Sequence, residues 1–236
     1  MTESLRGQRV LVVGAAGGIG RATAMAFASA GAAVSAAGRT PGQIAAVAEA
    51  VGGESVALDV LDNDAIERFF AGHPAFDHVV VAAASTTGGP VARLSLDDAK
   101  ASMESKFWGA YRVARACRIS EHGSITFVSG MLSQRPSAAS VLQGAINAAL
   151  EALARGLALE RAPVRVNTVS PGIIDTPLHD RMPEASRAAM FDRMRSGLPV
   201  RRLGQAEDVA QAILFAASNP FVTGSTINVD GGGRIM

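Results

Sequence analysis

The feature that most constrains this chain is a glycine-rich turn that directly follows an apolar run near the N-terminus. Residues 10–20 read VLVVGAAGGIG, and a stretch that favours a helix continues from Arg21. Gly14, Gly18 and Gly20 lack side chains, so phosphate groups can approach the backbone. The free N–H groups and the positive dipole of a helix N-terminus attract the same anions. A strand, this turn and a helix therefore predict an anion site suited to a nucleotide.

Composition limits the class of protein. The chain has 236 residues, 48% of them hydrophobic, with 25 glycines and a net charge of +1. This length suits one α/β domain with a sizeable core, and the apolar content excludes disorder. The charge is small and the arginines are dispersed, so we expect no nucleic-acid partner.

Cysteine usage and the apolar segments indicate the compartment. Cys117 is the only cysteine and allows no internal disulfide, which is typical of a reducing environment. The N-terminal residues MTESLRGQR lack the apolar core of a signal peptide. No apolar run approaches the roughly 20 residues that span a bilayer. We therefore expect a cytoplasmic protein that does not enter the membrane.

Short apolar runs alternate with helix-like stretches along the chain. Seven strands are expected, at residues 10–13, 33–37, 55–58, 78–81, 124–128, 164–169 and 225–229. Helices are expected between most of them, at 18–30, 41–51, 62–71, 95–117, 137–161 and 206–217, with Asp62 and Pro136-Ser137 as start signals. This alternation predicts βαβ units in a doubly wound parallel sheet with helices on both faces, as one domain over residues 1–236.

The segment 177–204 interrupts the alternation. It contains three prolines and a short helical patch around 184–196, and it follows the expected strand 164–169. Open α/β sheets bind ligands beyond the carboxyl ends of their strands, so we interpret this insertion as a lid over the crevice. An ordinary surface loop is the alternative. His179 within it is a candidate proton donor, with a solvated histidine as the alternative.

Further positions match one family in order along the chain. They are Ile19 between the last two glycines of the turn, Arg39-Thr40 after the second expected strand, Asp59-Val60 after the third, Asn167, Ser170-Pro171-Gly172 with Thr176 after the sixth, and the tail FAASNPFVTGSTINVDGG. With this pattern the chain resembles the short-chain dehydrogenase/reductase family over nearly its whole length. The resemblance implies a single-domain Rossmann-like α/β fold and a nicotinamide dinucleotide cofactor.

Arg39 indicates which dinucleotide is bound. An acidic residue at the end of the second strand would bind the ribose 2′-hydroxyl and select NAD(H), whereas an arginine accommodates a 2′-phosphate. Arg39 and the Thr40 hydroxyl therefore favour NADP(H), with a plain surface arginine as the alternative. The resemblance implies that Asp59 and Val60 touch the adenine and that Thr176 binds the carboxamide. The other cofactor residues that it implies are Gly14, Gly18, Ile19, Gly20, Ala82, Pro171 and Gly172.

The catalytic residues of this family are absent from the positions where the resemblance places them. Its members protonate the substrate with a Tyr-x-x-x-Lys pair, an upstream serine and an asparagine on the preceding helix. The only tyrosine here, Tyr111, lies far from that place. The register of Ala149–Leu153 puts Gln143 at the tyrosine position and Asn147 at the lysine position, while Gly130, next to Ser129, takes the serine position and Lys106 the asparagine position. Amides do not titrate near neutral pH, so Gln143 and Asn147 cannot act as general acids.

Lys106 is the residue best placed to supply the missing chemistry. It is one of two lysines, against twenty arginines, and we expect it to face Asn147. Its ammonium could then bind the ribose, Gln143 or a substrate oxygen, and a desolvated lysine has a lowered pKa and can act as an acid. The alternative is a stem packed along the helix with its head in solvent.

Two functions are compatible with this sequence. The first is an NADP(H)-dependent oxidoreductase with a non-standard active site, which transfers hydride to or from a small carbonyl, enone or imine-type substrate. Its candidate catalytic residues are Lys106, Gln143, Asn147 and Ser129. The alternative is a non-catalytic NADP-binding pseudoenzyme that acts as a sensor or an oligomer subunit. No His, Cys or carboxylate cluster has metal-ligand spacing, so no metal site is expected.

The resemblance also implies a homodimer or homotetramer formed through the helices at 95–117 and 137–161. Ala145, Ala149, Ala152 and Gly156 recur at helical spacing and would allow close approach of a partner helix. Packing within the core of one chain would explain the same spacing.

Overall fold

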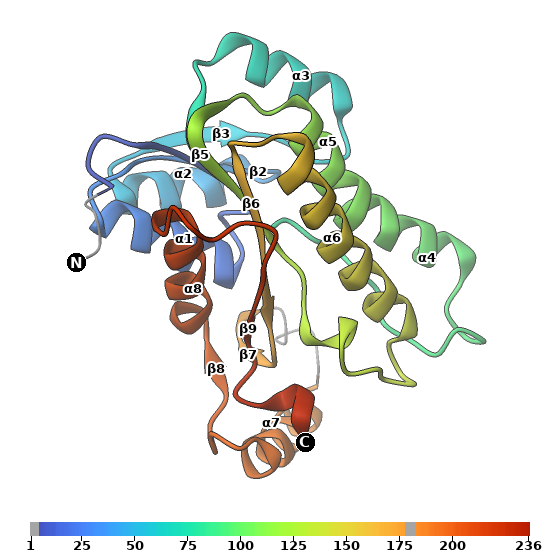
Figure 1. Ribbon diagram of the computed structural model, residues 1–236. Helices are drawn as coiled ribbons and strands as arrows, with labels where there is room; N and C mark the ends of the chain where they lie inside the picture. Colours follow the sequence, from blue (N-terminus) through green and yellow to red (C-terminus); the bar gives the residue numbers. More distant parts are fainter. Residues whose placement is uncertain (1–4, 178–182) are drawn as a thin grey trace.

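The computed structural model describes residues 5–177 and 183–236 (Figure 1). The strands are β1 (Arg9–Val13), β2 (Ala33–Gly38), β3 (Glu54–Ala57), β4 (Phe76–Val81), β5 (Ile119–Val128), β6 (Arg165–Pro171), β7 (Ile174–Asp175), β8 (Gly204–Gln205) and β9 (Thr226–Val229). The helices are α1 (Gly18–Ser29), α2 (Pro41–Val51), α3 (Asn63–Gly72), α4 (Leu96–Met103), the π-helical η1 (Glu104–Trp108), α5 (Gly109–Ala116), the 3-10 turn η2 (Met131–Ser133), α6 (Val141–Glu160), α7 (Glu184–Gly197), α8 (Ala206–Ser218) and the 3-10 turn η4 (Gly233–Ile235).

Seven strands form one parallel sheet in the order β3-β2-β1-β4-β5-β6-β9. The predicted doubly wound sheet and its seven strands are therefore confirmed. The chain winds outward from β1 to β3 and then returns to β4 on the other side of β1. Such a switch point leaves a crevice at the carboxyl ends of β1 and β4, where ligands of open α/β sheets bind.

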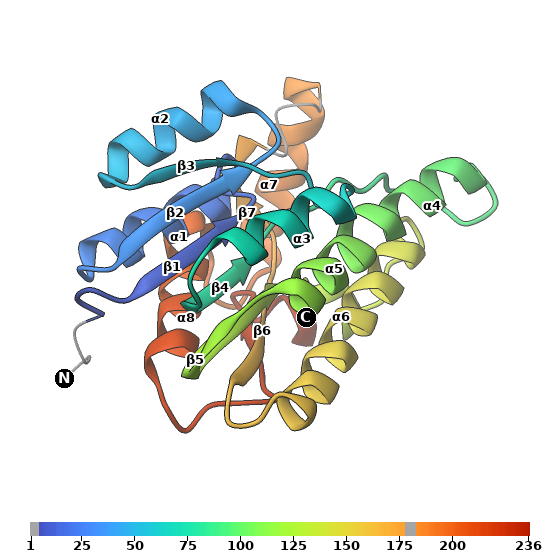
Figure 2. The same ribbon diagram turned by 90° about the horizontal axis from the view of Figure 1, so that it is seen from above.

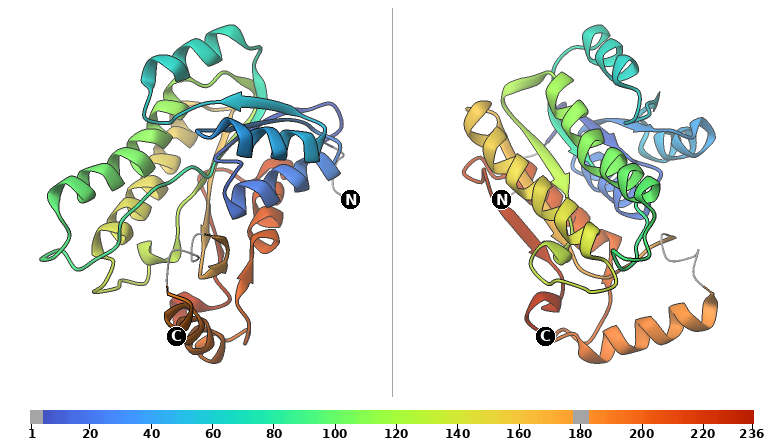
Figure 3. Two further views of the ribbon diagram at one scale, coloured as in Figure 1. Left: turned by 180° about the vertical axis from the view of Figure 1, so that it is seen from behind. Right: turned by 90° about the vertical axis from the view of Figure 1, so that its right-hand side faces the viewer.

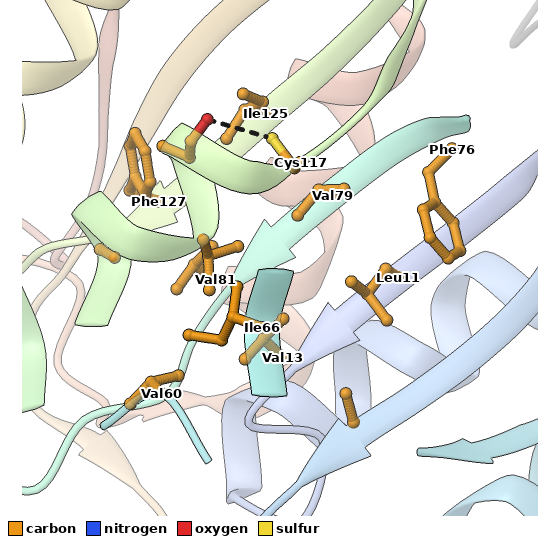
Figure 4. Close-up of a cluster of buried hydrophobic side chains, with 14 of the residues drawn as sticks. Leu11, Val13, Val60, Ile66, Phe76, Val79, Val81, Cys117, Ile125 and Phe127 are labelled. Carbon is orange, nitrogen blue, oxygen red and sulfur yellow. Dashed lines mark hydrogen bonds between the residues drawn. The ribbon is translucent and has the colours of Figure 1, made fainter. Parts of the chain in front are cut away.

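Helices cover both faces of the sheet, and alternate strand residues face the two layers (Figure 2). Leu11 and Val13 of β1 belong to the core beneath α3, α5 and α6, whereas Val10 and Val12 belong to the core beneath α1, α2 and α8. Figure 4 shows part of the first core, to which β4 adds Val79 and Val81. Burial on both faces explains why these strands read as continuous apolar runs.

Two predicted helices differ in detail from the structure. The helix expected at 137–161 begins only at Val141, because residues 137–140 form a turn. The Ser137 hydroxyl accepts the N–H of Ala139 at 3.3 Å, and the Ser137 carbonyl accepts the N–H of Ser140 at 3.0 Å. Short polar side chains that bind nearby backbone in this way compete with helix formation. The proline therefore precedes a turn and does not start the helix.

The helix expected at 95–117 is divided into α4, η1 and α5. The Ser95 hydroxyl caps its start by accepting the N–H of Asp98 at 3.0 Å. The middle segment is a π-helix, whose extra residue per turn displaces side chains from the faces they would occupy in a regular helix. Lys106 lies in this segment.

The insertion at 177–204 contains α7 and ends at β8, which pairs with β7 in a separate two-stranded sheet that the sequence did not predict. The helical patch expected at 184–196 is thus present as α7. None of the residues of α7 is buried, and the helix stands apart from the sheet and its helical layers (Figure 3). His179 lies outside the described residues. Closure of this segment over the crevice stays a prediction.

Within the described residues, no helix is both long enough and apolar enough to cross a bilayer.

Candidate active site

The glycine turn after β1 packs against two other segments at the carboxyl edge of the sheet. Gly14 has a φ of +90°, and a side-chain Cβ there would lie 2.5 Å from the backbone nitrogen of Ala83. A Cβ on Gly18 would lie 2.7 Å from the Thr176 side chain, and a Cβ on Gly20 would overlap the Gly14 carbonyl. Only glycine therefore allows this turn to meet the loop after β4 and the segment after β6.

The N-terminus of α1 is open to an anion. Gly17 is its N-cap residue and offers no side chain to the first-turn N–H groups, and no acidic residue lies in that turn. The partial positive charge of the helix end is therefore not offset locally. Gly17 lines both cavities at the switch point, so this charge faces the crevice.

The first cavity, of about 280 Å³, extends from the turn toward β2 and β3. Arg39 and Thr40 lie at its wall, together with Gly14, Val60 and Ala82. Arg39 is exposed and forms no hydrogen bond or ion pair within the described part of the chain. No carboxylate lines this cavity among those residues, so its electrostatic character suits a phosphate group.

The second cavity, of about 350 Å³, extends from the same turn toward β5 and β6. It shares Gly17, Ala82 and Ala84 with the first cavity, so the two adjoin across the switch point. The predicted cofactor residues Gly18, Ile19, Gly20, Pro171, Gly172 and Thr176 line it, as do the candidate catalytic residues Lys106, Ser129, Gln143 and Asn147. The structure thus gathers eleven of the twelve predicted cofactor residues and all four candidate catalytic residues around one crevice.

Asp59 is the predicted cofactor residue that lines neither cavity. Its carboxylate accepts the N–H of Leu61 at 3.0 Å, two residues further along the chain. This local bond is the kind by which aspartate stabilises a turn. The neighbouring Val60 reaches the first cavity.

Lys106 faces Asn147, as the sequence predicts. Its Nζ donates to the Asn147 side-chain oxygen at 2.7 Å and to the main-chain carbonyl of Ser129 at 2.8 Å. An ammonium has three N–H donors, so one remains for the cavity that Lys106 lines. Burial lowers the pKa of Lys106 to about 8, against the opposing effect of Glu151. The Lys106 side chain therefore does not adopt the alternative conformation, in which its ammonium would lie in solvent.

The two amides that follow on α6 are placed differently. Asn147 is buried, and a Cβ on Gly130 would come within 2.8 Å of its side-chain nitrogen, so the glycine allows this close approach. Gln143 lies one helical turn earlier and donates to the Thr86 hydroxyl at 3.3 Å. Gln143 and Thr86 both line the second cavity. Gln143 is thus positioned as a hydrogen-bonding group at the cavity wall.

Sequence reasoning missed Glu151 and Thr86. Glu151 is buried on α6, and the hydroxyls of Ser129 and Ser133 donate to its carboxylate at 2.9 and 2.6 Å. It lies four residues after Asn147 on the same helix face, which was the available signal. Thr86 lies in the loop after β4, whose path the sequence does not indicate.

The buried histidine of the sheet, His78, does not line either cavity. His78 is buried in β4, where its ring nitrogens bind Ser124 and Gln8. Within residues 5–177 and 183–236, no group of three His, Cys, Asp or Glu side chains is arranged to hold a metal ion.

Comparisons with known proteins find reductases and a dehydrogenase that match nearly the whole chain. Residues 14–233 match the family model described as enoyl-(acyl carrier protein) reductase. The chain is 34% identical over 242 residues to D-erythrulose reductase of Gallus gallus, covering 97% of this chain and 96% of the relative. It is 31% identical over 245 residues to a 3-oxoacyl-(acyl carrier protein) reductase of Thermotoga maritima, covering 97% and 98%. A solved small-chain dehydrogenase in complex with NADPH is 35% identical, with a TM-score of 0.85 and coverage of 98% of this chain and 100% of that one.

Two glycine variants test the structural role of the turn. We expect Gly14→Ala to lower the free energy of unfolding by about 1–3 kcal/mol or more, because of its positive φ and its contact with Ala83. Gly17→Ala is the matched control, since Gly17 has a φ of −75° and its Cβ would meet only the Gly14 carbonyl, at 3.4 Å. Urea unfolding measures both. Equal stability of the two variants would contradict this account of the turn.

Proposed function

We propose that this chain, which belongs to the short-chain dehydrogenase/reductase family, is an NADP(H)-dependent oxidoreductase whose active site is built around Lys106. The observation that carries the proposal is the Lys106 ammonium at the wall of the second cavity, held by Ser129 and Asn147 with one N–H free. The relatives with the matching fold are named as reductases, which supports an oxidoreductase.

The residues at the crevice fit a dinucleotide phosphate. The open N-terminus of α1 and Gly17 suit the pyrophosphate, and the unpaired Arg39 with Thr40 suits a 2′-phosphate. Pro171, Gly172 and Thr176, at the second cavity, would then hold the nicotinamide end. The NADPH in the solved relative supports the same preference.

Arg39→Ala tests the cofactor preference. We expect the variant to bind NADPH about 10- to 100-fold more weakly and NADH nearly unchanged, because a charge-assisted bond to the 2′-phosphate is lost. Arg68→Ala, an exposed arginine on α3, is the control and should leave both affinities unchanged. Calorimetric titration measures the dissociation constants. Equal losses for the two nucleotides would reject the role of Arg39.

The proposed chemistry places proton transfer on Lys106. Bound NADP(H) supplies or accepts a hydride. The third N–H of Lys106 can donate to a substrate oxygen, and a pKa of about 8 suits an acid that works near neutral pH. Gln143 can donate a hydrogen bond to the same substrate, and the lysine regains its proton from solvent. The amides at 143 and 147 do not titrate, so they orient groups and do not exchange protons.

The cavity indicates the class of substrate. Val128, Met131, Leu132, Ile173 and Ile174 give it an apolar wall, which suits a small organic molecule. Conjugated enones and imine-type compounds are favoured along with simple carbonyls. Hydride addition to an iminium leaves a neutral amine, and addition to an enone spreads the charge, so both need less help from an acid.

A second candidate function is favoured by the two amides. If Gln143 and Asn147 stand where family members carry the Tyr-x-x-x-Lys pair, the chain is an NADP-binding pseudoenzyme. It would then act as a sensor or as a subunit whose assembly depends on the cofactor. NADPH binding without turnover of any acceptor would favour this alternative.

Lys106→Met tests the role of the lysine in the first candidate function. We expect turnover of an accepted carbonyl, enone or imine to fall by about 10²–10⁴-fold, because the general acid is removed. Lys100→Met is the matched control, since Lys100 is the only other lysine and is exposed on α4. NADPH oxidation measures the rate. Unchanged turnover and NADPH affinity in Lys106→Met would remove Lys106 from the mechanism.

We also propose that the protein forms a homodimer or homotetramer through α5 and α6, which lie side by side (Figure 3). Ala145, Ala152 and Gly156 are exposed on α6 and Ala149 is half-buried, whereas the buried apolar residues of this helix are Ile146, Leu150, Ala154 and Leu157. The three exposed small residues therefore face away from the core of this chain. Their outward face permits close approach of another helix.

Light scattering tests this assembly. The wild type is expected to have at least twice the chain mass of 24.2 kDa. Ala152→Arg should lower the mass, because a long cation blocks close helix packing. Ala71→Arg on α3 is the control and should not. A monomeric wild type would contradict the proposal.

A further inference from the structure

Glu151 is a buried carboxylate that the reaction proposed above does not use. Its exposed fraction is 6%, and it does not line the second cavity. Within the described residues, no cation lies within ion-pair distance of its carboxylate. A buried charge is costly unless hydrogen bonds and a nearby opposite charge offset the loss of water. The groups around the Glu151 carboxylate should therefore include hydrogen-bond donors and a nearby positive charge.

Two hydroxyls from the segment after β5 meet this carboxylate. Ser129 Oγ donates to Glu151 Oε1 at 2.9 Å, and Ser133 Oγ donates to the same oxygen at 2.6 Å. The two serines flank Gly130 and the start of η2. The carboxylate therefore fixes both ends of this short turn to α6.

The same turn carries one of the two acceptors of Lys106. The main-chain carbonyl of Ser129 accepts from Lys106 Nζ at 2.8 Å, while its hydroxyl is bound to Glu151. Asn147, one turn before Glu151 on α6, accepts from the same ammonium at 2.7 Å. Ser129 thus connects the cation at the cavity wall to the carboxylate behind it.

We propose that Glu151 is a positioning residue for the reaction. Through Ser129 and Ser133 it holds the turn against which Lys106 is bound, and its negative charge keeps the Lys106 ammonium protonated at the cavity wall. This inference rests on the proposed function for its chemical meaning. The effect of the Glu151 charge on the protonation of Lys106 can be measured without turnover.

Glu151 is the charged group that acts on Lys106. Glu104, on the same helical segment as Lys106, is paired with Arg112. Among the described residues that line the second cavity, Lys106 has the only ionisable side chain. Burial lowers the pKa of Lys106 to about 8, and Glu151 raises it against that effect. Without the carboxylate, more of the lysine would be a neutral amine at neutral pH and could not donate its proton.

The experiment uses the scarcity of lysine in this chain. With lysine labelled at the ε-carbon, NMR should give two signals, from Lys100 and Lys106, and Lys100→Met assigns them. In Glu151→Gln, which keeps the hydrogen-bond acceptor but not the charge, we expect the titration midpoint of Lys106 to fall by about one pH unit or more. The Lys100 midpoint should not move. Glu160→Gln, at the exposed end of α6, is the matched control.

A second variant is needed in case Glu151→Gln does not fold. Glu151→Met removes the charge and fills the space with an apolar side chain. Proteins often tolerate such a replacement of a buried charged residue. It should show the same downward shift of Lys106. An unshifted midpoint in either folded variant would overturn the proposal. Unfolding of both variants would also overturn it, because Glu151 would then serve the fold and not the charge of Lys106.

Failure of the Glu151 proposal and failure of the proposed function would give different results. If Lys106→Met leaves turnover unchanged and Glu151→Gln still shifts the midpoint, Glu151 controls the charge of Lys106 but neither residue serves catalysis. If the enzyme does turn over a substrate, the alkaline limb of its pH profile should move to lower pH in Glu151→Gln. The same limb should return toward its original position in Glu151→Asp, which restores the charge.

Discussion

The close contact of the glycine turn with its two neighbours is the constraint on which the site depends. Gly14 approaches the backbone of Ala83, and Gly18 approaches Thr176, so the ends of β1, β4 and β6 are drawn to one place. A side chain at either glycine would separate these ends. The same contact exposes the N-terminus of α1 and joins the two cavities at Gly17, Ala82 and Ala84. The contacts of this turn therefore serve both the packing of the strand ends and the candidate anion site at the N-terminus of α1.

A second feature, the π-helical segment η1, places a cation at the wall of the second cavity. Lys106 lies in this segment and bonds Asn147 and the carbonyl of Ser129. The buried Glu151 lies behind Ser129, which binds both groups. The cavity wall thus carries a positive charge whose counter-charge is kept away from the substrate space. That separation lets a lysine donate toward a ligand without pairing directly with a carboxylate.

Much of this arrangement could be predicted from the sequence, because it depends on local patterns. Continuous apolar runs mark the doubly buried strands, and the glycine turn marks the switch point. The facing of Lys106 and Asn147 followed from the positions that the family resemblance assigns to them. Other features depend on side chains meeting across long separations. The Ser137 hydroxyl binds the backbone of its own turn, so α6 begins later than predicted. Glu151 is bound by Ser129 and Ser133, which lie about 20 residues earlier in the chain. No periodicity encodes such contacts.

A crystal structure of the protein with NADP⁺ would show whether the two adjoining cavities form one dinucleotide site with Lys106 at its reactive end. We expect the 2′-phosphate beside Arg39 and Thr40 and the nicotinamide in the cavity of Lys106 and Gln143. A nicotinamide outside that cavity, or a crevice that stays empty at saturating NADP⁺, would contradict this expectation.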